Sequence, residues 1–108
     1  MRIEYDNDEI EAFILHRTAH SKLYKKFLSN GTLMRDLDKV MVILDRVASC
    51  KILETSYASL HYERLKYGLH GRSSVRIGNK TKYRLVFTEN EERIKICLIE
   101  ISEHYGDK

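Results

Sequence analysis

The sequence predicts an α+β fold, in which an N-terminal strand and two helices pack on a small antiparallel β-meander. Through the first half of the chain, apolar residues recur at intervals of three and four, which is the spacing of amphipathic helices. In the second half they alternate with polar residues, which is typical of half-buried strands. Turn residues separate the alternating stretches, so we expect successive strands to pair antiparallel and to present one apolar face to the helices.

The first five residues alternate Ile3 with charged and aromatic neighbours, and we expect them to form a strand at the edge of the later meander. A helix should follow, because Asp6 and Glu9 have the spacing of a capping box. Its apolar positions continue as far as Leu28. Residues 17–21 are polar, so this part of the helix is expected to fray or bend.

A second helix is the most regular feature of the sequence. We expect Asn30 and Gly31 to end the first helix and Thr32 to cap the second. The second helix has one apolar stripe at nearly ideal helical spacing, formed by Met34, Leu37, Val40, Met41, Leu44, Val47 and Ala48. Over residues 50–71 this periodicity is lost, which predicts a mostly irregular segment that leads to the meander.

The meander is expected to begin with a hairpin around a turn at Gly78 and Asn79. Alternating residues on either side of this turn form its apolar face, namely Val75, Ile77, Tyr83, Leu85 and Phe87. Arg76 and Arg84 fall on the opposite face, where we expect both side chains to meet solvent. A charged turn then leads to a third strand, residues 93–101, which is rich in isoleucine.

Length and composition indicate one globular domain that spans residues 1–108, with 43% hydrophobic residues. The formal net charge is only +3, but between residues 51 and 84 eight lysine and arginine side chains stand against two acidic ones. Such a local excess attracts phosphate. A solvated charged face is nevertheless the more common role of a charge run of this size.

The sequence lacks the patterns of disulfide-linked, membrane-spanning, metal-binding and cofactor-binding proteins. The two cysteines make no disulfide framework, and Cys97 is expected to be a small buried residue of the third strand. Neither a transmembrane stretch nor a signal peptide is apparent, so we expect a cytoplasmic protein without a membrane partner. The histidines lack metal-ligand spacing, and neither a phosphate-binding glycine loop nor a nucleophile elbow is present. We therefore expect no metal and no cofactor.

The second half of the chain resembles a known family at nearly that family's spacing. The matching residues are Glu63-Arg64-Leu65-Lys66, Leu69-His70-Gly71, Ser74, Arg76-Ile77, Tyr83-Arg84-Leu85-Val86-Phe87 and His104-Tyr105. This pattern is similar to the RelE/ParE superfamily of small bacterial toxins, and within it to YoeB-like or HigB-like messenger RNA endonucleases. The resemblance implies a RelE-like fold, whose layout agrees with the one that periodicity predicts.

By resemblance, the chain would cleave RNA through attack of the ribose 2′-hydroxyl on the neighbouring phosphate. Glu63 matches the general base of the family, and Arg76 and Arg84 match the arginines that stabilise the charged phosphate. His104 matches the general acid, and Tyr105 beside it is the alternative proton donor. On adjacent strands the two arginines would bind one phosphate together. Each of these residues, taken alone, is also compatible with an ordinary surface role.

The resemblance further implies a ribosome-dependent toxin of a type II toxin–antitoxin pair. Its partners would be an antitoxin protein, the ribosome and messenger RNA, and Lys66, Lys80 and Lys82 would contact RNA. Two alternatives remain open. One is a ParE-like toxin that inhibits DNA gyrase without nuclease activity, and the other is an inactive module that only binds an antitoxin. The sequence also leaves open whether the chain forms a homodimer and which codon it would prefer.

Overall fold

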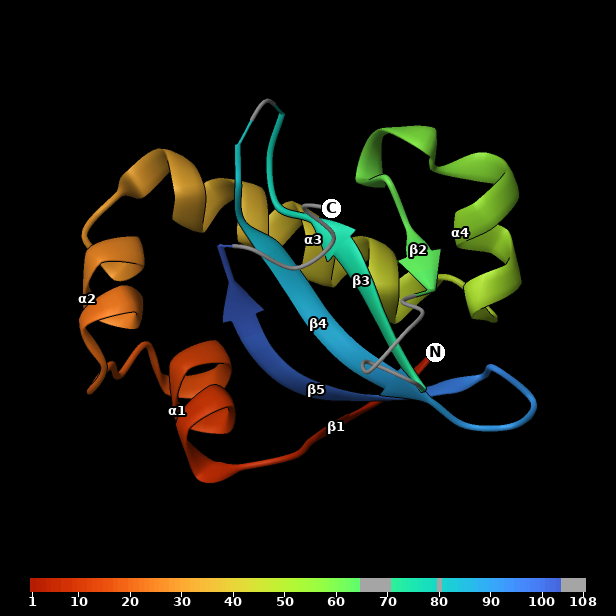
Figure 1. The fold of residues 1–108 in the computed structure, drawn as a ribbon, viewed down its shortest axis with the longest axis horizontal. Helices are drawn as coiled ribbons and strands as arrows, with labels where there is room; N and C mark the ends of the chain where they lie inside the picture. Colours follow the sequence, from red (N-terminus) through yellow and green to blue (C-terminus); the bar gives the residue numbers. More distant parts are fainter. Residues whose placement is uncertain (65–70, 80, 104–108) are drawn as a thin grey trace.

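The computed structural model describes residues 1–64, 71–79 and 81–103 (Figure 1). In chain order, its elements are β1 (Arg2–Tyr5), α1 (Asp8–His16), α2 (Lys22–Leu28), α3 (Gly31–Arg46), α4 (Cys50–Ser56), the 3₁₀-helix η1 (Ala58–Leu60), β2 (Glu63–Arg64), β3 (Arg72–Arg76), β4 (Arg84–Glu89) and β5 (Lys95–Ser102). The strands form one mixed sheet with the order β1-β5-β4-β3-β2. The predicted α+β class is therefore confirmed.

The sheet contains the predicted meander and its predicted edge strand. β3, β4 and β5 pair antiparallel in sequence order, as the alternating pattern indicates. β1 pairs with β5 at one edge of the sheet, and this pairing is parallel. The other edge is formed by β2, a short strand that the sequence did not predict, which pairs antiparallel with β3. The candidate residue Glu63 belongs to this additional strand.

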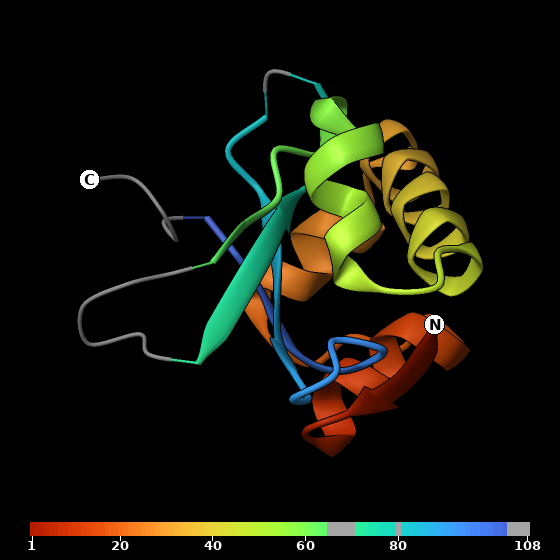
Figure 2. The ribbon, with the colours of Figure 1, turned by 90° about the vertical axis from the view of Figure 1, so that its right-hand side faces the viewer.

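α3 and α4 lie on one side of the sheet (Figure 2). The largest fully buried side chains come from helices and strands alike: Ile10, Phe13, Phe27, Leu37, Leu44, Leu53, Ile77, Leu85, Phe87, Ile96, Leu98 and Ile101. Phe27 connects the two layers, because its ring packs edge-on against Phe13 on α1 and against Tyr83 beside β4. Among the described residues, no helix is both long and apolar enough to cross a membrane.

The predicted first helix is interrupted, so its prediction as one helix is wrong. α1 ends at His16, and Arg17 after it has a left-handed backbone with φ 55°. The Nη2 of Arg17 lies 2.5 Å from Asp38 Oδ1 on α3. α2 then has its own N-cap, because the Ser21 hydroxyl accepts a hydrogen bond from an amide of the first turn. Asn7 caps the start of α1 in place of Asp6. The interruption lies in the polar stretch where a bend was expected.

Two further boundaries differ from the prediction. Asn30 begins α3 and does not end the preceding helix, because its side-chain oxygen accepts a hydrogen bond from the Leu33 amide at 3.1 Å. The segment expected to be irregular contains α4, η1 and β2 within residues 50–64. These elements are too short to produce a periodic pattern, but Leu53 and Leu60 anchor them in the core.

A bulge in β5 keeps its apolar residues toward the helices. The pairing register between β4 and β5 shifts between Val86 and Phe87. An extra residue on β5 at this point lets Leu98 and Ile101 both reach the core, although they are three positions apart. Cys97 is only half-buried, so the expectation that it is a buried core residue is wrong.

Candidate functional site

The predicted catalytic residues that the structure describes lie on one face of the sheet. Ser74 pairs with Glu63 across β2 and β3, and Arg76 pairs with Arg84 across β3 and β4. Directly paired residues place their side chains on the same face, and alternate residues of one strand share a face. Glu63, Arg76 and Arg84 therefore belong to the same face, opposite the core.

Arg84 is buried on this face, which corrects the expectation that it meets solvent. Only 6% of the Arg84 surface is exposed to solvent. Its Nε donates to the Ser74 hydroxyl at 2.7 Å, and its Nη2 donates to the His61 carbonyl at 2.5 Å. The same Nη2 lies 3.5 Å from Oε1 of Glu63. The guanidinium thus connects β4 to the segment that leads into β2.

The hydrogen bond from Arg84 to the His61 carbonyl involves a residue with an unusual backbone conformation. It follows η1 with φ 47° and ψ 48°, in the left-handed region that non-glycine residues rarely adopt. The residue closes the 3₁₀-helix, since its amide donates to the Ala58 carbonyl at 3.1 Å. Its own carbonyl accepts the hydrogen bond from Arg84. A charged donor therefore stabilises a backbone conformation that would otherwise be unfavourable.

Glu63 and Arg76 remain more accessible than Arg84. The Glu63 side chain is 45% exposed, so its carboxylate is available to a substrate while it faces the Arg84 guanidinium. Arg76 is half-buried and forms no hydrogen bond or ion pair with any residue that the structure describes. Of the two predicted arginines, Arg76 is therefore the one whose guanidinium makes no hydrogen bond with the described residues.

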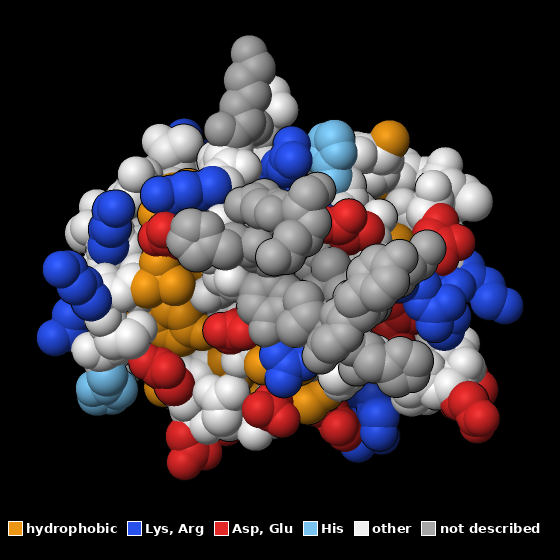
Figure 3. Space-filling view, in the orientation of Figure 1, with side chains coloured by type: hydrophobic (Ala, Val, Ile, Leu, Met, Phe, Trp, Pro, Cys, Tyr) orange, Lys and Arg blue, Asp and Glu red, His pale blue; other side chains and the backbone are white. Residues whose placement is uncertain are grey.

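Acidic side chains of β5 and its C-terminal end offset part of the expected positive charge. Lys82 Nζ lies 3.3 Å from Glu103 Oε2, and Arg72 Nη1 lies 4.0 Å from Glu100 Oε2. Acidic and basic side chains are accordingly mixed around this face (Figure 3). The excess of basic residues that the sequence shows between positions 51 and 84 is thus smaller in three dimensions.

Four predicted site residues lie outside the described residues, so the structure does not place them. They are Lys66, Lys80, His104 and Tyr105. Within the described part of the chain, no group of three or more histidine, cysteine, aspartate or glutamate side chains is arranged to hold a metal ion.

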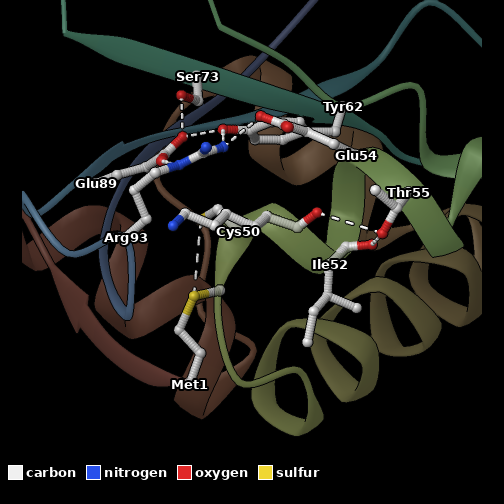
Figure 4. Close-up of polar contacts among 10 residues, drawn as sticks. Met1, Cys50, Ile52, Glu54, Thr55, Tyr62, Ser73, Glu89 and Arg93 are labelled. Carbon is white, nitrogen blue, oxygen red and sulfur yellow. Dashed lines mark hydrogen bonds and ion pairs between the residues drawn. The ribbon is translucent and has the colours of Figure 1, made fainter.

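A second polar cluster lies on the core side of the same sheet (Figure 4). Glu89, at the end of β4, accepts hydrogen bonds from the Ser73 hydroxyl at 2.5 Å, from Arg93 Nε at 2.9 Å and from the Tyr62 hydroxyl. Arg93 Nη2 also donates to the Tyr62 oxygen at 2.9 Å and to Glu54 Oε1 at 2.5 Å. This cluster joins α4, β3 and β4 to the residue that precedes Glu63.

Two competing effects set the pKa of Glu89. Burial by itself raises the pKa of this carboxyl group, but hydrogen bonds from Ser73, Tyr62 and Arg93, with the charge of Arg93, outweigh it. The resulting pKa lies below its usual value, so Glu89 is ionised near neutral pH. Burial, and secondarily the Glu89 carboxylate, raises the pKa of the nearby Cys50 thiol to about 12. Cys50 is therefore a neutral core residue and not a nucleophile.

The cluster around Glu89 was not predicted, although the sequence contains a signal for it. Ser73 is two residues before Val75, and Glu89 is two residues after Phe87. Both polar residues therefore extend the apolar faces of their strands. A polar residue at a core-facing position of a strand requires a buried hydrogen-bond partner. Ser73 and Glu89 are partners of this kind for each other.

Comparisons with known proteins give one fold relationship. No family model matches the sequence, and no curated protein matches it either. Among solved structures, the chain is similar to the YoeB/ParE toxin from Agrobacterium tumefaciens, with a TM-score of 0.56 and 15% sequence identity. The superposition covers 97% of this chain and 100% of that chain. Over nearly its whole length, this chain has the α+β fold of that toxin.

Proposed function

We propose that this chain is the toxin of a toxin–antitoxin pair and that it cleaves messenger RNA on the ribosome. The fold similarity to a YoeB/ParE toxin supports the broader assignment. The observation that carries the nuclease assignment is that one sheet face holds an accessible carboxylate, Glu63, with Arg84 beside it and Arg76 on the same face. Phosphate-directed acid–base chemistry needs these two kinds of side chain close together.

In the proposed reaction, Glu63 removes the proton of the ribose 2′-hydroxyl, and the resulting oxygen attacks the adjacent phosphorus. The bond to the 5′-oxygen of the next nucleotide breaks, and His104 or Tyr105 protonates this leaving oxygen. The products are a 2′,3′-cyclic phosphate and a free 5′-hydroxyl. Arg76 and Arg84 supply positive charge near the phosphate as negative charge develops on it.

Arg76 is proposed to make the direct phosphate contact, because its guanidinium is not engaged by the described residues. The positive charge of Arg84 is shared with Glu63, which lies at 3.5 Å from its Nη2. Arg84 would thereby orient the Glu63 carboxylate toward the substrate on this face. Lys66, Lys80 and Lys82 are proposed to contact RNA of the ribosome or the message.

The proposed antitoxin covers the face that carries Arg76 and Arg84, since acidic residues of a partner would neutralise the site. The affinity of the complex should then fall as salt concentration rises. A small partner encoded by the neighbouring gene is the expected source. A complex in which that partner leaves Arg76 open to solvent would contradict inhibition by site coverage.

Inhibition of DNA gyrase is the second candidate function. The ion pairs of Arg72 with Glu100 and of Lys82 with Glu103 favour it, because they reduce the positive charge available to RNA. A protein that acts only by binding another protein needs neither a general base nor a general acid. The accessible carboxylate of Glu63 beside Arg84 therefore favours the nuclease.

Two parallel assays separate these functions. The purified chain is added to ribosomes programmed with an end-labelled message and, separately, to a gyrase supercoiling reaction. We expect a shortened message whose upstream fragment ends in a 2′,3′-cyclic phosphate, together with normal supercoiling. An intact message with inhibited supercoiling would contradict the nuclease assignment and support the second candidate.

A further inference from the structure

The short segment from His61 to Glu63 is held at two consecutive residues by charged side chains from opposite faces of the sheet. The His61 carbonyl accepts a hydrogen bond from Arg84 Nη2 on the outer face. The Tyr62 hydroxyl contacts Glu89 and Arg93 on the core side. Glu63 is the next residue and begins β2. The two residues immediately before Glu63 are therefore both held in place by hydrogen bonds.

The side chains that hold the Tyr62 hydroxyl are largely buried. The Glu89 side chain is 4% exposed and that of Arg93 is 13% exposed. The Tyr62 ring stacks on Phe87 with 6.4 Å between ring centroids, so both its ring and its hydroxyl are held. Arg93 extends the anchor to Glu54 on α4. Figure 4 shows the Glu89 and Arg93 side chains meeting at the Tyr62 hydroxyl.

Glu63 has little support of its own. β2 contains only Glu63 and Arg64, both exposed, and it pairs with one neighbour at the edge of the sheet. A two-residue edge strand contributes few hydrogen bonds that could fix a side chain. The backbone position of Glu63 is therefore set mainly by the residues that precede it, while its carboxylate faces Arg84 Nη2 at 3.5 Å.

We infer that Tyr62, held by Glu89 and Arg93, is a positioning residue for Glu63. This inference rests on the proposed function, in which Glu63 takes the proton of the 2′-hydroxyl. A general base acts only within hydrogen-bonding reach of its proton. A displacement of about 1 Å lowers a rate by about a hundredfold. Tyr62 itself touches no reacting atom in this account.

The test compares the variants Tyr62→Phe and Tyr24→Phe. Each variant removes one hydroxyl whose oxygen is hydrogen-bonded, since the Tyr24 oxygen accepts a hydrogen bond from the Ile101 amide at 3.1 Å. Tyr24 lies on α2 and not in the segment that leads into β2. Both variants therefore lose the hydrogen bonding of one hydroxyl, but only Tyr62→Phe weakens the anchor next to Glu63.

Three measurements are made on the full chain. Single-turnover cleavage on saturating programmed ribosomes should be about tenfold to a hundredfold slower in Tyr62→Phe and unchanged in Tyr24→Phe. Ribosome affinity should be unchanged in both variants. Amide hydrogen exchange at residues 61–64 should become faster in Tyr62→Phe alone. A loss of rate without a loss of affinity is not expected from a general loss of stability.

The possible outcomes distinguish the two proposals. A wild-type chain that does not cleave the message contradicts the proposed function. A wild-type chain that cleaves, together with an equal rate or unchanged exchange in Tyr62→Phe, overturns the positioning role. If Tyr62→Phe does not fold, Ser73→Ala replaces it, because it removes one hydrogen bond to Glu89 and leaves Tyr62 intact. That variant should slow cleavage severalfold, and an unchanged rate would likewise overturn the inference.

Discussion

The two faces of the sheet each hold an arginine beside a glutamate, Arg84 buried and Arg93 half-buried, and the two pairs differ in how the carboxylate is used. On the core side, Arg93 contacts two glutamates, and Glu89 is 4% exposed and accepts three hydrogen bonds. On the outer face, Arg84 contacts one described glutamate at a longer distance, and this Glu63 is 45% exposed.

The difference separates a structural ion pair from a candidate catalytic one. A buried carboxylate with several donors is stabilised by its partners and is closed to a substrate. An exposed carboxylate that meets a buried guanidinium at only one atom keeps its other lone pairs available to a substrate. Glu89 should therefore matter chiefly for folding, and Glu63 chiefly for activity.

The largest expected effect on stability is that of Glu89→Ala. The substitution leaves Arg93, Tyr62 and Ser73 without their shared acceptor, and breaking a buried pair in this way costs about 3–5 kcal/mol of unfolding free energy. Urea denaturation measures this loss. The control is Glu91→Ala in the exposed turn, which should change the free energy of unfolding by less than about 0.5 kcal/mol. Equal effects of the two variants would contradict the structural role of Glu89.

Arg84→Ala should lower the unfolding free energy by about 1–3 kcal/mol, because the buried Ser74 hydroxyl and the partly buried His61 carbonyl lose a donor. This expectation replaces the one drawn from the sequence, in which a solvent-facing arginine contributes little to stability. The variant should also fail to stop translation when expressed at the level of the wild type. Unchanged stability would show that the contacts of Arg84 are not significant for folding.

The pH dependence of stability should also distinguish Glu89. Its pKa in the folded state lies below the value of 4.5 taken for the unfolded chain, so its stabilising contribution is present above about pH 4.5. This contribution is lost as pH falls through the lower, folded-state pKa. Between about pH 5 and pH 3, Glu89→Gln should therefore lose less stability than the wild type. A matched loss in Glu89→Gln and the wild type would contradict the lowered pKa of Glu89.

The smallest expected effect on stability is that of Arg76→Ala. Arg76 is half-buried and engages none of the described residues, so its removal should change the unfolding free energy by about 0.5 kcal/mol or less. Cleavage should nevertheless fall, because this guanidinium is proposed to contact the phosphate. A stability loss as large as that of Arg84→Ala would remove the contrast between the two arginines.

The sequence predicted the sheet well, because the alternation of apolar residues reflects which face of each strand is buried. The shared face of Arg76 and Arg84 follows from that alternation and from the turn between their strands, and the pairing register confirms it. The edge position of β1 was also predicted correctly. These features depend on local periodicity, which a single sequence contains.

The missed features depend on contacts between distant residues. The break after α1 uses a left-handed Arg17 that no local pattern marks. The burial of Arg84 depends on the left-handed His61 and its carbonyl, 23 positions away in the chain. α4 is too short for its periodicity to be recognised. Tertiary hydrogen bonds determine each of these features, so residue type and spacing alone did not predict them.

The central claim is that the exposed carboxylate of Glu63 acts as a general base. Its most direct test is the single-turnover cleavage rate of Glu63→Gln on programmed ribosomes. Glu4→Gln is the control, because Glu4 is similarly exposed, at 41%, on the strand at the opposite edge of the sheet. Glu63→Gln should cleave about a hundredfold to ten-thousandfold more slowly than the wild type, with ribosome affinity and stability nearly unchanged. A wild-type rate in Glu63→Gln would contradict the claim.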